Sequence, residues 1–189
     1  MKISQDRPSG DGNNNIEKDF MKILGIDPGL QLCGYAVIEK NQNNIKLLEA
    51  GIFRTDPKAT LDYRLNQIAR DMQILLDRFR PEHLSIEELY SHYAHPKTSI
   101  LMGHARGVIL QQAAHAKTKV HGFAATRIKK SLTGNGRAGK IQMQRSIQTL
   151  LGLAQMPEPH DVADAIAIAL CCAYSLNIDS GEIKNDSTD

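Results

Sequence analysis

Residues 22–39 read KILGIDPGLQLCGYAVIE, and this stretch decides how the fold begins. An apolar run over 22–27 ends at a Pro-Gly dipeptide, which is typical of turns. Apolar residues resume over 32–39, and a third segment of the same kind covers 45–55. We therefore predict an antiparallel three-stranded meander, with Asp27 at the end of its first strand.

The rest of the chain alternates helical and strand-like patterns. Apolar residues recur every three or four positions over 61–79, which predicts an amphipathic helix. Further strands are predicted over 83–89 and 118–123, and further helices over 97–116, 140–151 and 161–174. This order indicates a mixed α/β domain in which helical crossovers join parallel strands.

Two of these helices carry specific packing predictions. Gly103 and Gly107 lie one turn apart and would let another helix pack closely against the helix over 97–116. The helix over 140–151 is expected to turn four apolar residues inward: Ile141, Ile147, Leu150 and Leu151.

Charge is divided unevenly along the chain. Its 189 residues include 23 Lys or Arg and 21 Asp or Glu, a formal net charge of +2. Residues 89–157 contain ten of the basic residues and no acid, so this stretch carries +10 and the remainder −8. A long acid-free stretch predicts a polyanionic partner, most simply nucleic acid. Basic residues scattered over solvated faces are the alternative.

Length and composition exclude several classes of protein. A chain of 189 residues suggests one domain. No apolar run approaches the ~18 residues of a membrane span, so we expect no membrane partner. Cys33, Cys171 and Cys172 are too few and too badly spaced for a disulfide framework or a zinc site. A reducing, cytoplasmic setting is therefore expected.

Four carboxylates stand out by their surroundings. Asp27 ends an apolar strand, and Glu87 lies near the end of another. Asp161 and Asp164 share one face at the start of an apolar helix. Converging acids repel one another, and Mg²⁺ or Mn²⁺ would remove that repulsion. Two such ions about 4 Å apart stabilise both oxygens of a phosphodiester displacement, so we predict a two-metal nuclease site.

Each acid also has a structural interpretation. Asp27 before Pro-Gly could begin a turn, and Asp161 could favour a helix N-terminus, to which Asp164 would add. Strand alternation sends one of Glu87 and Glu88 away from the other. The G-x-G-x-x-G pattern over 134–139 does not directly follow a predicted strand, which favours a flexible loop over a nucleotide site.

The chain resembles RuvC, the family of bacterial crossover (Holliday) junction endodeoxyribonucleases. The resemblance rests on ILGIDPGLQLCGYAVIE at 23–39, SIEELY at 85–90, GHARGV at 103–108, TGNGRAGK at 133–140 and HDVADAIAIAL at 160–170. It implies a ribonuclease-H-like fold, with a five-stranded mixed sheet flanked by helices. It also implies a homodimer that resolves four-way junctions by paired symmetric nicks in recombination and repair, together with the branch-migration proteins RuvA and RuvB.

The resemblance assigns metal-binding roles to the four acids. Asp27 should bridge two ions and Glu87 should hold one of them. Asp161 and Asp164 should support the other ion. Metal-activated water would then attack the phosphodiester and leave 5′-phosphate and 3′-hydroxyl ends.

The resemblance also assigns DNA contacts. Lys129 and Lys140 match lysines near the scissile DNA, with generic surface charge as the alternative. Tyr90 matches an aromatic residue of junction recognition. Stacking on an unpaired base suits Tyr90, and anchoring its own loop is the alternative.

We predict three parts in the chain: a disordered N-terminal extension over 1–20, a nuclease domain over 21–176 and a polar C-terminal tail over 177–189. Residues 1–20 are expected to be either an unneeded extension or upstream sequence wrongly included. Other functions on the same fold are a ribonuclease H that cuts RNA–DNA hybrids, a YqgF-like nuclease, and a non-catalytic junction-binding module.

Overall fold

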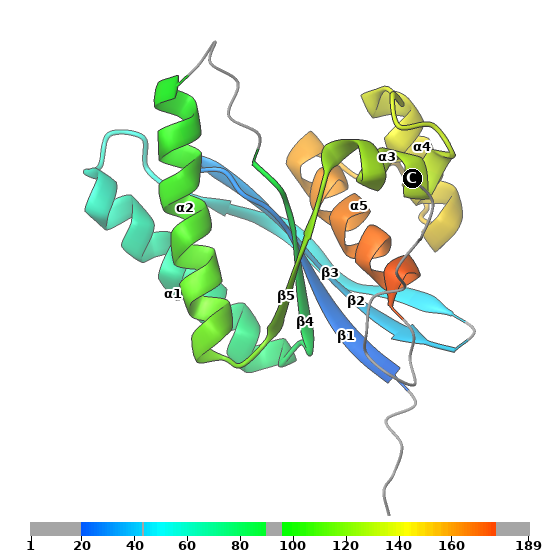
Figure 1. Ribbon diagram of the computed structural model, residues 1–189, viewed down its shortest axis with the longest axis horizontal. Helices are drawn as coiled ribbons and strands as arrows, with labels where there is room; N and C mark the ends of the chain where they lie inside the picture. Colours follow the sequence, from blue (N-terminus) through cyan, green and yellow to red (C-terminus); the bar gives the residue numbers. More distant parts are fainter. Residues whose placement is uncertain (1–19, 43, 90–95, 177–189) are drawn as a thin grey trace, which may run out of the picture.

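A five-stranded mixed sheet forms the centre of the protein (Figure 1). The computed structural model describes residues 20–42, 44–89 and 96–176. The strands are β1 (Phe20–Asp27), β2 (Leu32–Asn41), β3 (Ile45–Arg54), β4 (His83–Glu87) and β5 (Lys119–Phe123). The helices are α1 (Leu61–Phe79), α2 (Pro96–His115), α3 (Ala125–Thr133), α4 (Lys140–Leu151) and α5 (His160–Ser175).

The strands follow the order β3-β2-β1-β4-β5 across the sheet. Strands β1, β2 and β3 are antiparallel neighbours, which confirms the predicted meander. Strands β4 and β5 continue the sheet in parallel with β1, and the helices α1 and α2 make the crossovers. The predicted mixed α/β sheet is therefore confirmed.

Helices cover both faces of the sheet (Figure 1). On one face, α1 and α2 pack on side chains such as Leu24 and Ile26 of β1. On the other face, α5 packs on Ile23 of the same strand, with α3 and α4 outside it. The alternation of Ile23 and Leu24 between the two cores is the period-two pattern of a strand buried on both faces.

The helix α5 lies unusually close to the sheet because both surfaces are made of small residues. A Cβ atom at Gly25 of β1 would lie 2.3 Å from the carbonyl oxygen of Ala165 and 2.7 Å from the Cβ of Ala169. Only glycine leaves room for this approach. The close contact fixes where the N-terminal end of α5 meets the strand ends.

The sequence pattern predicts no element over residues 124–132, and the structure forms α3 there. The helix is short, and it follows Ala124, whose side chain cannot cap it. Ile128 is buried and Leu132 packs against the same core, so one i, i+4 apolar pair was the available signal. Two residues are a weak helical pattern.

The predicted inward face of α4 is partly wrong. Ile147 is fully buried and Leu151 packs against the core, but Ile141 is 61% and Leu150 47% exposed. Met143 lies four residues before Ile147 and is buried instead. Residues four apart share a helix face, and neither Ile141 nor Leu150 belongs to that row.

Among the described residues, no helix packs against Gly103 and Gly107, so the close helix contact that they would allow stays a prediction. A Cβ atom at either position meets no atom within 4 Å in the described part of the protein. The buried face of α2 is formed by Ala105, Ile109 and Ala113 instead. The glycines face outward because the tertiary contact with α1 uses another side of the helix.

The three cysteines are buried with free thiols. In the part of the chain that the structure describes, none of the helices combines the length and hydrophobicity that a membrane span requires.

Candidate active site

Asp27 and Glu87 are the last residues of two neighbouring parallel strands, β1 and β4. The two strands are in register up to the pair Ile26 and Ile86. Because parallel strands end at the same edge of a sheet, the residues that follow this pair lie side by side. Both carboxylates are half-buried.

The helix α5 brings two further acids to this edge. Asp161 lies in its first turn and Asp164 three residues later, on the same side. Gly34 of β2 pairs with Asp27 across the sheet, and a Cβ at Gly34 would lie 2.0 Å from the carbonyl oxygen of Asp161. The missing side chain at Gly34 therefore lets the start of α5 rest beside the end of β1.

The four carboxylates interact through their charges. Burial raises the pKa of Asp27 from 3.8 to about 7, and three neighbours add to this rise: Asp164, Glu87 and Asp161. Burial also raises the pKa of Glu87, to which Asp164 contributes. The pKa of Asp164 is raised by burial and further by Asp161. All four predicted metal-binding acids therefore lie close enough to interact through their charges.

Two lysines reach the same place from α3 and α4. Lys129 and Lys140 line one pocket with Glu87 and Asp164. The charge of Lys140 opposes the rise in the pKa of Asp27, and that of Lys129 opposes the rise at Glu87. Six of the seven predicted site residues thus converge, while Tyr90 lies outside the described residues.

Carboxylate oxygens from three elements are a donor set that suits a hard divalent cation. Within residues 20–42, 44–89 and 96–176, no three Asp, Glu, His or Cys side chains are arranged to hold one ion. The acids are close enough for their charges to interact, but their oxygens do not form a ligand sphere. Mutual repulsion disfavours a closer approach of the ionised carboxylates, and a cation would relieve that repulsion.

The structure adds Arg106 to the residues that shape the site. Its guanidinium, on α2, donates a hydrogen bond to the backbone carbonyl of Glu87. This bond ties the end of β4 to the helix on the opposite face of the sheet. Arg106 lies within the GHARGV motif, but its sequence position alone does not reveal a partner 19 residues away.

The positions of Glu88 and of residues 134–139 decide two of the alternatives. Glu88 is exposed and interacts with the charge of Arg106, so Glu87 is the acid that faces the site. The G-x-G-x-x-G stretch lies between α3 and α4 and follows a helix. The strand that a dinucleotide-binding loop requires before it is therefore missing at this place in the fold.

The family model of the crossover junction endodeoxyribonuclease RuvC matches residues 23–172. The chain belongs to the RuvC family. The RuvC of Rhodopirellula baltica is 46% identical over 155 residues, which cover 82% of this chain and 87% of that relative. The RuvC of Heliobacterium modesticaldum is 42% identical over 156 residues, which cover 82% of this chain and 96% of the relative.

Solved structures agree with the RuvC assignment. Thermus thermophilus RuvC in complex with a Holliday junction substrate has a TM-score of 0.77 at 32% identity, over 82% of this chain and 93% of that chain. The same protein in a second structure has a TM-score of 0.74. The resolvase of Fowlpox virus, with 19% identity and a TM-score of 0.55, supports the fold alone. The predicted ribonuclease-H-like fold of the RuvC family is therefore confirmed.

Proposed function

We propose that this RuvC-family chain resolves four-way (Holliday) DNA junctions by paired symmetric nicks that leave 5′-phosphate and 3′-hydroxyl ends. The observation that carries the proposal is the convergence of four acids with two lysines at one edge of the sheet. Acids of this kind bind cations, and lysines beside them bind the phosphate that is to be cut. Membership of the RuvC family names the substrate class.

RuvC nucleases depend on metal ions, and we propose that two Mg²⁺ ions bind here, with Mn²⁺ as a substitute. Asp27 would hold both ions, Glu87 one of them, and Asp161 with Asp164 the other. When bound, the ions would activate water and stabilise charge on the attacking and leaving oxygens. The lysines keep the phosphate beside the acids, which would otherwise repel it.

We propose that the enzyme acts as a homodimer, because symmetric nicks need two copies of the site. The outward face of α2 supports this proposal. It carries Gly103 and Gly107, which meet no neighbour among the described residues, and Ile100, which is 60% exposed. A second copy packed there would cover an apolar groove on each chain. Action in the cytoplasm with RuvA and RuvB belongs to the same proposal, on family resemblance.

A cleavage assay tests the proposed chemistry. The purified chain should nick a four-way junction in paired positions with Mg²⁺ and leave a duplex of the same sequence uncut. Asp27→Asn should abolish cleavage and keep junction binding, because it removes an acid but no phosphate contact. Asp77→Asn, at an exposed position on α1, is the matched control and should cut normally.

Three results would contradict the proposal. Undiminished cleavage by Asp27→Asn would remove the acids from the mechanism. Preferential cleavage of an RNA–DNA hybrid would replace the junction with the substrate of a ribonuclease H. A chain that binds the junction but does not cleave it with any divalent metal ion would be a junction-binding module and not a nuclease.

A further inference from the structure

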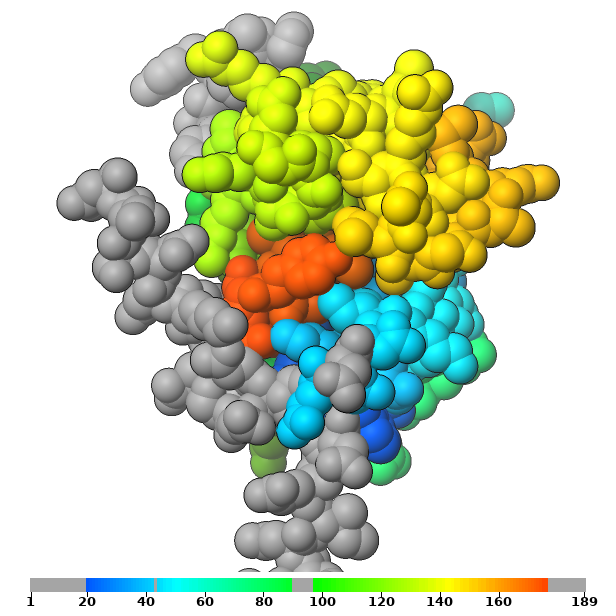
Figure 2. Space-filling view, turned by 90° about the vertical axis from the view of Figure 1, so that its right-hand side faces the viewer, coloured from blue at the N-terminus to red at the C-terminus, as the bar shows by residue number. Residues whose placement is uncertain are grey.

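A basic hollow lies on the side of α3 that faces away from the acids. It lies between α3 and the C-terminal end of α5, which are neighbours on the face shown in Figure 2. Apart from Gly136, its lining residues all carry a polar group on the side chain, and none is an acid: Thr126, Arg127, Lys130, Ser131, Tyr174 and Ser175. The candidate active site does not use any of these residues.

The guanidinium of Arg127 is held in place although its side chain is exposed. It lies 5.0 Å from the centre of the Phe123 ring, in a cation–π contact. Its Nη2 donates a hydrogen bond of 3.2 Å to Oγ of Ser175, whose hydroxyl donates one of 2.9 Å to the carbonyl of Cys171. The contacts with Phe123 and Ser175 leave other N–H groups of the guanidinium free to bind a ligand.

No carboxylate of the described residues balances the positive charge of the hollow. Among the described residues, no Asp or Glu forms an ion pair with Arg127 or Lys130. Both cations fall within the acid-free stretch over 89–157. A fixed guanidinium beside an ammonium and several hydroxyl groups is a site for a phosphate, which arginine can bind through two parallel hydrogen bonds.

We propose that this hollow binds a backbone phosphate of the junction DNA, beyond the phosphates next to the cut. The inference rests on the proposed function. The helix α3 supplies Lys129 to the pocket with the acids and supplies Arg127 and Lys130 to the hollow. A helix with its side chains is about 10 Å wide, so a strand that leaves the acids and crosses α3 reaches the hollow within a few nucleotides.

The C-terminal residues 177–189 are the competing occupant. They contain four acids and one lysine, and they follow Leu176 directly after Ser175 of the hollow. The DNA is favoured because α3 contributes residues both to the pocket with the acids and to the hollow. A DNA strand that contacts Lys129 can therefore continue to Arg127 and Lys130.

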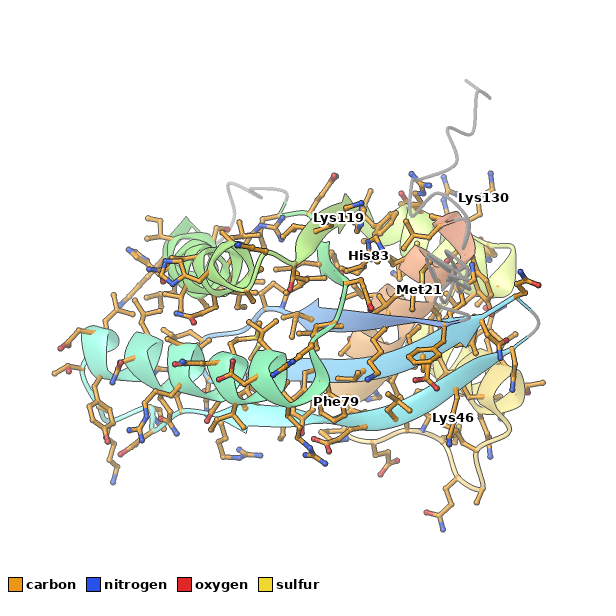
Figure 3. All side chains as sticks on the ribbon, turned by 90° about the horizontal axis from the view of Figure 1, so that it is seen from below. Met21, Lys46, Phe79, His83, Lys119 and Lys130 are labelled. Carbon is orange, nitrogen blue, oxygen red and sulfur yellow. The ribbon has the colours of Figure 1, made fainter. Side chains whose placement is uncertain are left out.

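Junction binding in EDTA, measured over a range of salt concentrations, tests the inference. Arg127→Gln and Lys130→Gln should each weaken binding about fivefold, and each should reduce the slope of log affinity against log salt by about 1. Arg127→Lys should keep most of the slope. Lys46→Gln removes the same charge on β3, at another edge of the molecule (Figure 3), and should change neither quantity.

The outcomes separate the two proposals. A full chain that binds the junction no better than a duplex would overturn the proposed function. A chain that prefers the junction, with Arg127→Gln and Lys130→Gln behaving like Lys46→Gln, would overturn only this inference.

A variant with Asp179, Glu182, Asp186 and Asp189 replaced by their amides tests the competing occupant. If the tail fills the hollow, this variant should bind the junction more tightly than the parent chain. Arg127→Gln should then weaken binding only when the four acids of the tail are replaced by amides. That result would overturn the inference in favour of the tail. Equal effects of Arg127→Gln with either tail would support the DNA contact.

Discussion

Ionisable side chains lie at both ends of β4, half-buried at the carboxyl end and with His83 buried at the other, but the two ends hold them in different states. At the carboxyl end, Glu87 meets Asp27 and the acids of α5, and burial with mutual repulsion raises the pKa of these groups. At the opposite end, Nδ1 of His83 lies 2.8 Å from Nε2 of His121 on β5. Burial, and next the charge of His121, lower the pKa of His83 to about 4.

The difference follows from hydrogen-bonding capacity. One neutral imidazole donates and the other accepts, so the histidine pair satisfies itself without charge. Ionised carboxylates only accept, so the acids cannot satisfy one another and need cations. The acids can ionise only against burial and mutual repulsion, which a cation would offset, so their cluster indicates a cation-binding site, whereas the histidine pair is part of the core.

The largest effect on stability and cleavage is expected from a methyl group at Gly34, which lies against the start of α5. Gly34→Ala places a Cβ about where the Asp161 carbonyl oxygen now lies, so α5 must move away from Asp27. We expect a loss of about 2 kcal/mol in the free energy of unfolding and at least a tenfold loss of junction cleavage. Urea denaturation and the cleavage assay measure both.

Gly103→Ala is the matched control for the free energy of unfolding alone, because a Cβ there meets no atom of the described residues within 4 Å, whereas its cleavage would also report on the proposed dimer face. This variant should be as stable as the parent or up to about 1 kcal/mol more stable, since alanine favours the helix. Equal stability of Gly34→Ala and Gly103→Ala would show that the approach of α5 does not depend on Gly34.

The next largest effect is expected on the pH dependence of stability, from the carboxylate of Asp27. The pKa of Asp27 is about 7 in the folded chain and ordinarily 3.8, so its contribution to stability is present below pH 3.8 and is lost as the pH rises to 7. Asn cannot ionise. In EDTA, Asp27→Asn should therefore raise the free energy of unfolding by roughly 2 kcal/mol at pH 8 and have little effect at pH 4.

Urea denaturation at the two pH values measures this difference, and Asp77→Asn on the exposed side of α1 serves as the control. Divalent ions should stabilise the parent chain more than Asp27→Asn, because the parent has more repulsion to relieve. A parent chain that is more stable than Asp27→Asn in EDTA at pH 8 would rule out repulsion as the dominant force.

The smallest effect is expected at the histidine end. The folded pKa of His83, about 4, lies below the ordinary 6.5, so stability is full above pH 6.5 and is lost as the pH falls towards 4. His83→Asn should flatten this dependence by about 1 kcal/mol between pH 6.5 and 4. Thermal unfolding at several pH values measures this dependence. The control is His104→Asn, at an exposed position on α2, which should show the same pH dependence of stability as the parent chain.

The sequence predicted the sheet well because strands buried on both faces give continuous apolar runs. The acids were recognisable as candidates because Asp27 and Glu87 interrupt such runs at strand ends. Their roles as metal ligands stay predictions. Helix α3 was missed because Ile128 and Leu132 alone carry its pattern, and the partner of Arg106 was invisible because it is a backbone carbonyl on another element.

Local pattern by itself therefore determined all five strands, every helix except α3, and which acids lie at their ends, since these follow from the spacing of apolar residues along the chain. Only the tertiary structure decided which side of each helix is covered. It turned Gly103 and Ile141 outward, let α5 approach the sheet at Gly25 and Gly34, and fixed Arg127 against Phe123. These outcomes depend on the surface that each element meets, and that surface comes from residues far away in the sequence.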